Sequence, residues 1–208
     1  MPIVIDVIGE TDHFLPEDRT PAHEGVLFVL HSPGDTYIGC FGFSDNDYAT
    51  QVITADALGV NISIACDKRE AATPTCRPIL QRIVDAFAKR GKSTVTITTA
   101  GPLSNVPGEI YHNKIMVSKA TDGGEDYCVE GSTNFTHPAC SEANTLRIFR
   151  NNVWAAKAIS DHIAVCQWAN TNHPDWQLKP TSAAPVVVTP GAASIFTALS
   201  GSTPCQQT

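Results

Sequence analysis

The chain has 208 residues, and its 21 acidic and 14 basic side chains give a formal net charge of −7. This length is enough for a domain with a substantial core, and 42% hydrophobic against 17% charged residues excludes wholesale disorder. No apolar stretch approaches the roughly 18 residues of a membrane span, and the acidic balance excludes a chain-wide basic field for a polyanion.

Seven cysteines are spread along the chain, and none forms a Cys-x-x-Cys pair. This spacing argues against a zinc ribbon or a thioredoxin-type motif. Cys40 and Cys66 lie in apolar runs, where a free thiol behaves as a small hydrophobic group. The first residues also lack the basic segment and long apolar stretch of a secretory signal. We therefore expect a cytoplasmic protein, or a secreted or periplasmic one if a signal peptide has been removed.

The first half of the chain contains a predicted strand-helix-strand unit. Val26–His31 and Thr36–Phe43 are apolar runs separated by turn residues, the pattern of two strands. Asp47–Leu58 has helical spacing, and Val60–Asp67 is rich in β-branched residues. A strand, a helix and a strand in succession predict a parallel pair with a right-handed crossover.

The second half continues the alternation of helices and strands. A helix is predicted over 78–90, a strand over 94–99, a hairpin from strands 110–117 and 126–130, a strand over 145–149 and a helix over 153–169. The last helix is expected to bury the face made of Trp154, Ala158, Ile159, Ile163, Cys166 and Trp168. Together these elements predict an α/β fold with a mixed, largely parallel sheet flanked by helices on both faces. We expect one domain over 1–176 and a linker-like appendage over 177–208.

The hairpin contains the strongest functional pattern. In a strand, residues i and i+2 face the same side, so His112 and Lys114 are expected to project together. Ser132 and Asn134 would share a face at the same edge and supply neutral donors. Such a set suits phosphoryl transfer, because an imidazole can attack phosphorus while Lys and Asn hold the non-bridging oxygens.

His-x-Lys at 112–114, followed by Gly-Ser-x-Asn-Phe at 131–135, resembles the HKD motif of the phospholipase D superfamily. The segment Tyr37–Ser44, the helix after it and Gly59–Asp67 resemble the unit that precedes this motif in the family. The similarity spans about Val26 to Trp168. A lone His-x-Lys would carry little weight, and the surrounding elements make the resemblance specific.

The resemblance implies a metal-independent phosphodiesterase that works through a phosphohistidine and uses no cofactor. The family mechanism needs two motifs that face each other, one histidine attacking phosphorus and the other protonating the leaving oxygen. This chain has one motif, which implies a homodimer with a composite site. Single-motif members are commonly homodimeric phosphodiesterases of nucleic acids, so the resemblance favours a nucleic-acid substrate and an endonuclease.

Two departures from the family pattern affect the site. The family has an Asp five residues after the Lys, where this chain has Lys119, and Asp122 or Asp126 could substitute. The family also has a carboxylate beyond the Gly-Ser segment that supports the histidine. Glu142 is the candidate here, within one residue of register.

Three alternatives stay open at this point. The protein could be a phospholipase D acting on phospholipid head groups. It could also be a catalytically degenerate module that binds phosphate or only dimerises, or half of a two-motif enzyme. Among other features, we expect His13, His23 and His31 to be solvated, and His162, which lies on the last helix near its apolar face, to pack there. Basic residues Lys68, Arg69, Arg77 and Arg82 are interpreted as a solvated surface rather than a cleft. His137 and Cys140 are too few ligands for a metal site, and none is expected.

Overall fold

The computed structural model describes residues 10–15, 17–104, 109–135 and 144–181. The strands in this part of the chain are β1 (Thr11–Phe14), β2 (Asp35–Cys40), β3 (Asn61–Asp67), β4 (Thr94–Thr98), β5 (Lys114–Ser118), β6 (Tyr127–Gly131) and β7 (Thr145–Arg150). The helices are α1 (Arg19–Leu30), α2 (Asn46–Ala57), α3 (Lys68–Ala71), α4 (Cys76–Ala88) and α5 (Asn152–Asn172), with 3₁₀ turns η1 (Gly101–Leu103) and η3 (Pro174–Trp176). None of these helices is long and apolar enough to cross a membrane.

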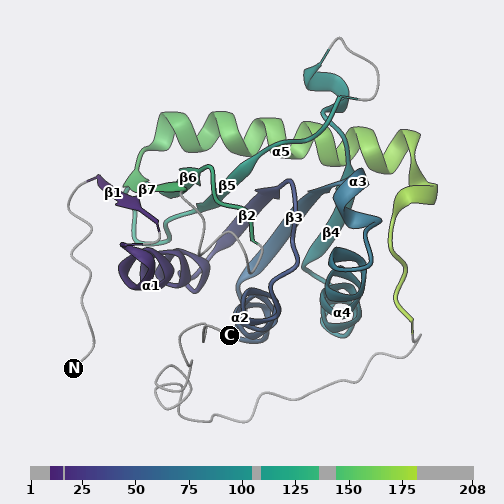
Figure 1. Ribbon diagram of the computed structural model, residues 1–208, viewed down its shortest axis with the longest axis horizontal. Helices are drawn as coiled ribbons and strands as arrows, with labels where there is room; N and C mark the ends of the chain where they lie inside the picture. Colours follow the sequence, from purple (N-terminus) through teal and green to yellow (C-terminus); the bar gives the residue numbers. More distant parts are fainter. Residues whose placement is uncertain (1–9, 16, 105–108, 136–143, 182–208) are drawn as a thin grey trace.

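The strands form one mixed sheet in the order β1-β7-β6-β5-β2-β3-β4. Parallel pairing is confined to β2, β3 and β4, and the other four pairs are antiparallel. The predicted α/β class and mixed sheet are confirmed, with a smaller parallel share than the sequence predicted. The reason is that β5 pairs antiparallel with β2, and β6, β7 and β1 continue the sheet beyond β5 in antiparallel pairs (Figure 1).

The predicted strand-helix-strand unit is β2-α2-β3. Its two strands are parallel and in register, with Ile38 opposite Ile64. Helix α2 begins where the Asp45 carboxylate accepts hydrogen bonds from the N–H groups of Asp47 (2.7 Å) and Tyr48 (3.0 Å). Such an N-cap satisfies donors that the first helical turn leaves without partners. This part of the prediction is confirmed.

The strand predicted at Val26–His31 is wrong, because Val26–Leu30 belong to α1 and His31 is its C-cap. Ala22, Val26, Val29 and Leu30 are all buried, at the three- and four-residue spacing of a helix face. The apolar run was too short for strand and helix to be distinguished by periodicity alone. The turn that follows it is present, but it connects a helix to β2.

Helices cover both faces of the sheet, as predicted: α1, α2 and α4 lie on one face and α5 crosses the other (Figure 1). The buried face of α5 differs from the prediction, with Ile163 39% exposed. The buried positions are instead Ala155, Ala158, His162, Val165 and Ala169. Three of these are alanines, which let the helix approach the sheet closely, while larger apolar side chains lie at its flanks.

Residues just after the predicted boundary at 176 form hydrogen bonds with β4 and α4. The Gln177 side chain accepts a hydrogen bond from the Ile97 N–H (2.9 Å) and donates to the Ile97 carbonyl (3.0 Å) on the edge strand β4. Asp85 of α4 accepts from the N–H (2.8 Å) and hydroxyl (2.6 Å) of Thr181. This short segment therefore protects part of an open sheet edge. The rest of the predicted appendage, 182–208, lies outside the described residues.

Candidate active site

The predicted histidine-lysine pair lies at the edge where β2 and β3 end and β5 begins. Strand β5 is shorter than predicted and starts at Lys114, so His112 precedes it. The two side chains nevertheless meet: Lys114 Nζ lies 3.2 Å from Nδ1 and 3.1 Å from Nε2 of His112. Nζ also donates to the His112 carbonyl oxygen at 3.3 Å. An imidazole and an ammonium group can thus act on the same phosphoryl group.

Phe41, directly after β2, forms an aromatic wall beside this pair. Its ring centre lies 4.8 Å from that of His112, with the rings tilted by 59°. Lys114 Nζ lies 5.5 Å from the same ring centre, within the range of a cation–π contact. Burial lowers the pKa of Lys114, while His112 is exposed. The site therefore combines a partly desolvated cation with an accessible imidazole.

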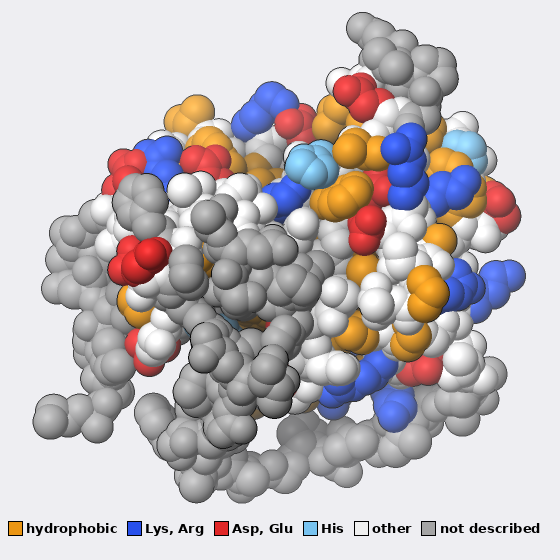
Figure 2. Space-filling view, in the orientation of Figure 1, with side chains coloured by type: hydrophobic (Ala, Val, Ile, Leu, Met, Phe, Trp, Pro, Cys, Tyr) orange, Lys and Arg blue, Asp and Glu red, His pale blue; other side chains and the backbone are white. Residues whose placement is uncertain are grey.

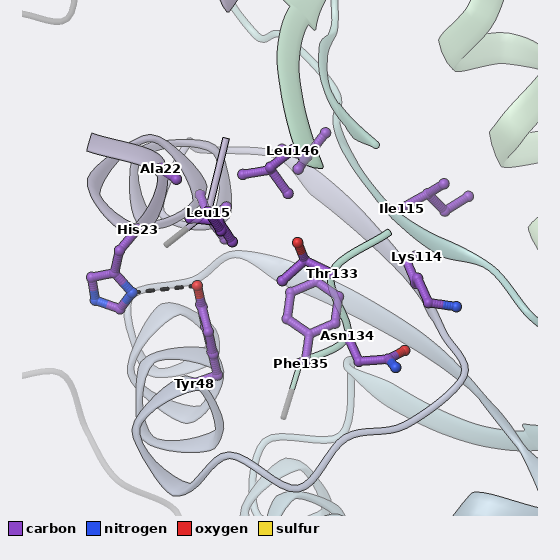
Figure 3. A pocket seen from close by; sticks show the side chains of 12 residues that line it. Leu15, Ala22, His23, Tyr48, Lys114, Ile115, Thr133, Asn134, Phe135 and Leu146 are labelled. Carbon is purple, nitrogen blue, oxygen red and sulfur yellow. Dashed lines mark hydrogen bonds between the residues drawn. The ribbon is translucent and has the colours of Figure 1, made fainter. Parts of the chain in front are cut away.

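Asn134 lies on the same side as Lys114. Both line a small cavity of about 30 Å³, in which Lys114 and Asn134 lie on one side and His23 and Tyr48 on the other (Figure 3). Within the described part of the chain, Asn134 Oδ1 is buried without a hydrogen-bond partner. A buried amide oxygen without a partner costs free energy, so this side chain has capacity for a bound donor such as a water molecule.

His23 differs from the sequence expectation. It lies on α1 rather than in a loop, and its Nδ1 is 3.3 Å from Tyr48 Oη across the wall of this cavity. His31 is half-buried too, with Nε2 3.0 Å from Gln51 Oε1, and burial lowers its pKa. Both expectations of solvated histidines were wrong because His23 lies on the packed helix α1 and His31 caps its C-terminal end.

The Ser132 side chain forms hydrogen bonds with the start of β7 and the residue before it. Its hydroxyl donates to Asn144 Oδ1 (3.0 Å) and accepts from the Thr145 N–H (3.0 Å). Gly131, before it, has no room for a side chain, since a Cβ would lie 2.1 Å from the Thr145 carbonyl oxygen. The Gly-Ser pair thus fixes the turn that presents Asn134. Glu142, like His137 and Cys140, lies outside the described residues.

Lys119, which stands where the family has an Asp, lies one residue past the far end of β5. It is exposed, and its N–H donates to the Asp35 carbonyl oxygen at 2.9 Å. Of the two carboxylates that could substitute, Asp126 accepts from the Ala120 N–H (2.9 Å) and Asp122 from the Gly124 N–H (2.9 Å). Both carboxylates stabilise the hairpin connection and take no part in the His112 end of the strand.

Basic side chains lie around α3, on the face shown in Figure 2. Lys68 and Arg69 are exposed, and Lys68 Nζ lies 3.9 Å from the centre of the Trp176 ring. Arg82 instead donates to Asn46 and Thr50 and so connects α4 to α2. Among the described residues, no three His, Cys, Asp or Glu side chains lie close enough together to hold a metal ion.

A family model described as "Cardiolipin synthase, PLD-like domain" matches residues 31–164, more than half of the chain. The chain therefore belongs to the phospholipase D-like superfamily of phosphodiesterases. No curated protein matches by sequence. The resemblance inferred from the HKD-type residues is confirmed at the level of the family.

Solved structures share the fold at low sequence identity. Nuc of Salmonella typhimurium, described as a phospholipase D family member, has a TM-score of 0.61 and 17% identity, over 77% of this chain and 95% of its own. NucT from Helicobacter pylori has a TM-score of 0.62 and 15% identity, over 77% and 96%. TrmBL2, an archaeal chromatin protein, has a TM-score of 0.53 and 13% identity, over 79% and 54%. These similarities establish the fold.

Two residues at the site carried no sequence signal of their own. Phe41 belongs to an apolar run and could not be distinguished from a core residue. Asp67 ends β3, and its contact with the residue before His112 links positions more than forty apart. Such a contact needs the three-dimensional fold.

Proposed function

We propose that this protein is a metal-independent phosphodiesterase in which His112 is the nucleophile. The proximity of Lys114 Nζ to the ring nitrogens of His112, at 3.1–3.2 Å, carries the proposal. Lys114 supplies the fixed positive charge, and Asn134 supplies a neutral donor on the same side. Ser132, and Glu142 beyond the described residues, support these groups.

The reaction proceeds in two displacements. A ring nitrogen of His112 forms a bond to phosphorus as the bond to the leaving oxygen breaks, and a second histidine gives that oxygen a proton. The same second histidine then takes a proton from water, which attacks phosphorus and releases His112. Atoms and protons balance without a co-reactant other than water.

The second histidine is proposed to be His112 of another copy. One chain supplies one motif, so two copies around a two-fold axis would form a single composite site. His112 is exposed and therefore accessible to a partner. The alternative, that this chain is half of a two-motif enzyme, places an equivalent histidine on a longer polypeptide.

Nucleic acid is the proposed substrate, cleaved internally as by an endonuclease. TrmBL2, which shares this fold, is described as having a novel mode of DNA binding, and Nuc and NucT match over nearly their whole lengths. The net charge of −7 opposes tight duplex binding, which favours single strands. The description of the matching family favours a phospholipid head group as the second candidate substrate.

A catalytically degenerate binding module is the second candidate function. Lys119 in place of the family Asp favours it, whereas the retained His112, Lys114 and Asn134 favour turnover.

Five cysteines in the described part of the chain are free, which supports the proposed cytoplasmic location.

Hydrolysis of bis-p-nitrophenyl phosphate in EDTA tests the proposal. Wild type should release p-nitrophenolate, and His112→Asn should reduce the rate to background. His31→Asn is the matched control, since that histidine lies next to the opposite end of β2 and should retain activity. Background rates from both wild type and His112→Asn would favour the binding module.

A further inference from the structure

The segment before β5 presents His112 without belonging to the sheet. Since β5 begins at Lys114, the strand pairing with β2 does not fix the His112 main chain. The His112 side chain itself is exposed, beside Phe41 and Lys114. The location of the imidazole therefore depends on what holds the preceding residue, Tyr111.

Tyr111 is held through its main chain by a buried carboxylate. Asp67 Oδ2 accepts a hydrogen bond from the Tyr111 N–H at 2.7 Å, and Oδ1 accepts one from the Arg69 N–H at 2.8 Å. Asp67 is 0% exposed. A carboxylate without water needs such donors, and hydrogen bonds to an ionised acceptor are stronger than those between neutral groups.

The Tyr111 side chain provides a second anchor. It is 3% exposed and packs with Ala65 of β3 and Val165 of α5. Gly39 of β2 leaves the room it needs: a Cβ at that position would lie 2.5 Å from Tyr111 Oη. Tyr111 is therefore fixed at both its main chain and its ring.

We infer that Asp67 is a positioning residue for the His112 nucleophile, acting through the Tyr111 main chain. This inference rests on the proposed function. Attack on phosphorus needs the imidazole within a narrow range of distance and angle, and displacements of an ångström are costly in rate. Asp67 connects the end of β3 to the residue before the nucleophile, so it sets that geometry without touching substrate.

Asp67→Asn is the primary test. An amide retains one acceptor oxygen but turns its NH₂ group toward one of the two N–H donors, so one hydrogen bond is lost. We expect kcat for bis-p-nitrophenyl phosphate to fall at least about tenfold, with KM changed less than about twofold. The nuclear magnetic resonance lines of the His112 ring should broaden or split as the imidazole samples more positions.

Asp56→Asn is the matched control. Asp56 is another buried carboxylate, accepting from Ser93 Oγ (2.7 Å) and Arg90 (3.1 Å) near the C-terminal end of α2. Both variants should lose stability, but Asp56→Asn should retain kcat and a single set of His112 lines. If Asp67→Asn does not fold, Gly39→Ala disturbs the same anchor from the Tyr111 ring and should give the same kinetic signature.

The inference would be overturned if folded Asp67→Asn kept both its kcat and its His112 lines unchanged. Where only Gly39→Ala folds, an unchanged kcat in that variant would overturn it. These failures are distinguishable from failure of the proposed function. If only the inference fails, His112→Asn is inactive while Asp67→Asn and Gly39→Ala are active. If the proposed function fails, His112→Asn is as active as wild type.

Discussion

His162 Nε2 of α5 lies 2.9 Å from Ser63 Oγ of β3. His162 is 1% exposed, between the helix and the sheet. Its Nδ1 has no hydrogen-bond partner among the described residues. Burial lowers the pKa of His162 to about 4. The imidazole is therefore neutral in the folded protein at neutral pH, on the opposite face of the sheet from α1 and α2.

This pKa predicts a loss of stability in mild acid. The unfolded histidine, with a pKa near 6.5, binds a proton more readily than the folded one, so stability falls as the pH drops from about 6.5 to about 4. Over this pH range the free energy of unfolding should fall by about 3 kcal/mol in total. Urea unfolding at several pH values should show a flatter profile for His162→Gln than for wild type. Parallel profiles would contradict the assignment.

Three thiols, those of Cys66, Cys128 and Cys166, should be unreactive in the folded protein. Burial raises the pKa of Cys128 to about 12 and that of Cys166 to about 11. The pKa of Cys66 is raised well above its ordinary value, chiefly by its contact with Cys40 and then by burial. Because the thiolate is the reactive form, alkylation at pH 8 followed by peptide mass mapping should modify these three positions only after unfolding. Rapid labelling of native protein would refute this.

Lys114 should be essential for turnover. Lys114→Met removes the cation beside His112 and should lower kcat about 100-fold or more, the loss typical of removing a group that stabilises transition-state charge. Lys119→Met is the matched control at the far end of β5, and it should retain wild-type rates. A comparable loss in both variants would indicate that charge in general, rather than this position, is needed.

The basic residues of α3 provide a test of substrate class. The Arg69 N–H and the Tyr111 N–H both donate to the Asp67 carboxylate, so the Arg69 main chain lies close to the segment that carries His112. If the substrate is a polyanion, Arg69→Glu should lower kcat/KM for a single-stranded oligonucleotide and leave bis-p-nitrophenyl phosphate unaffected. Lys92→Glu makes the same charge change just before β4, at the opposite edge, and should affect neither. Equal sensitivity of the two substrates to Arg69→Glu would count against a polyanion.

Subunit mixing tests the composite site. Wild type and His112→Asn are mixed in equal amounts and incubated long enough for subunits to exchange. If each site needs His112 from both copies, p-nitrophenolate release should be about one quarter of that of wild type at the same total protein concentration, because about a quarter of random dimers carry two wild-type chains. Independent sites would retain about one half.

The sequence predicted the parts of the fold that depend on local pattern. The β2-α2-β3 unit followed from two apolar runs and the helical spacing between them, and the hairpin from its turn residues. The helix at Val26–Leu30 was missed because a short apolar run fits either element. The buried stripe of α5 was misplaced because side-chain size suggested Ile163, whereas close packing on the sheet selects alanines.

The site was predictable only as a set of residue types. His112, Lys114 and Asn134 were identifiable from their spacing, although the strand that was expected to align them begins two residues after His112. The anchor at Asp67 and the aromatic wall at Phe41 depend on contacts between segments distant in sequence. No periodicity or spacing rule contains such contacts.

The stereochemistry at phosphorus tests the central claim most directly. A chiral phosphorothioate diester can be hydrolysed by wild type in isotopically labelled water and the configuration of the product determined. Two successive in-line displacements through phosphohistidine each invert the centre, so the account predicts net retention. Net inversion would mean that water attacks phosphorus directly, and it would contradict a nucleophilic role for His112.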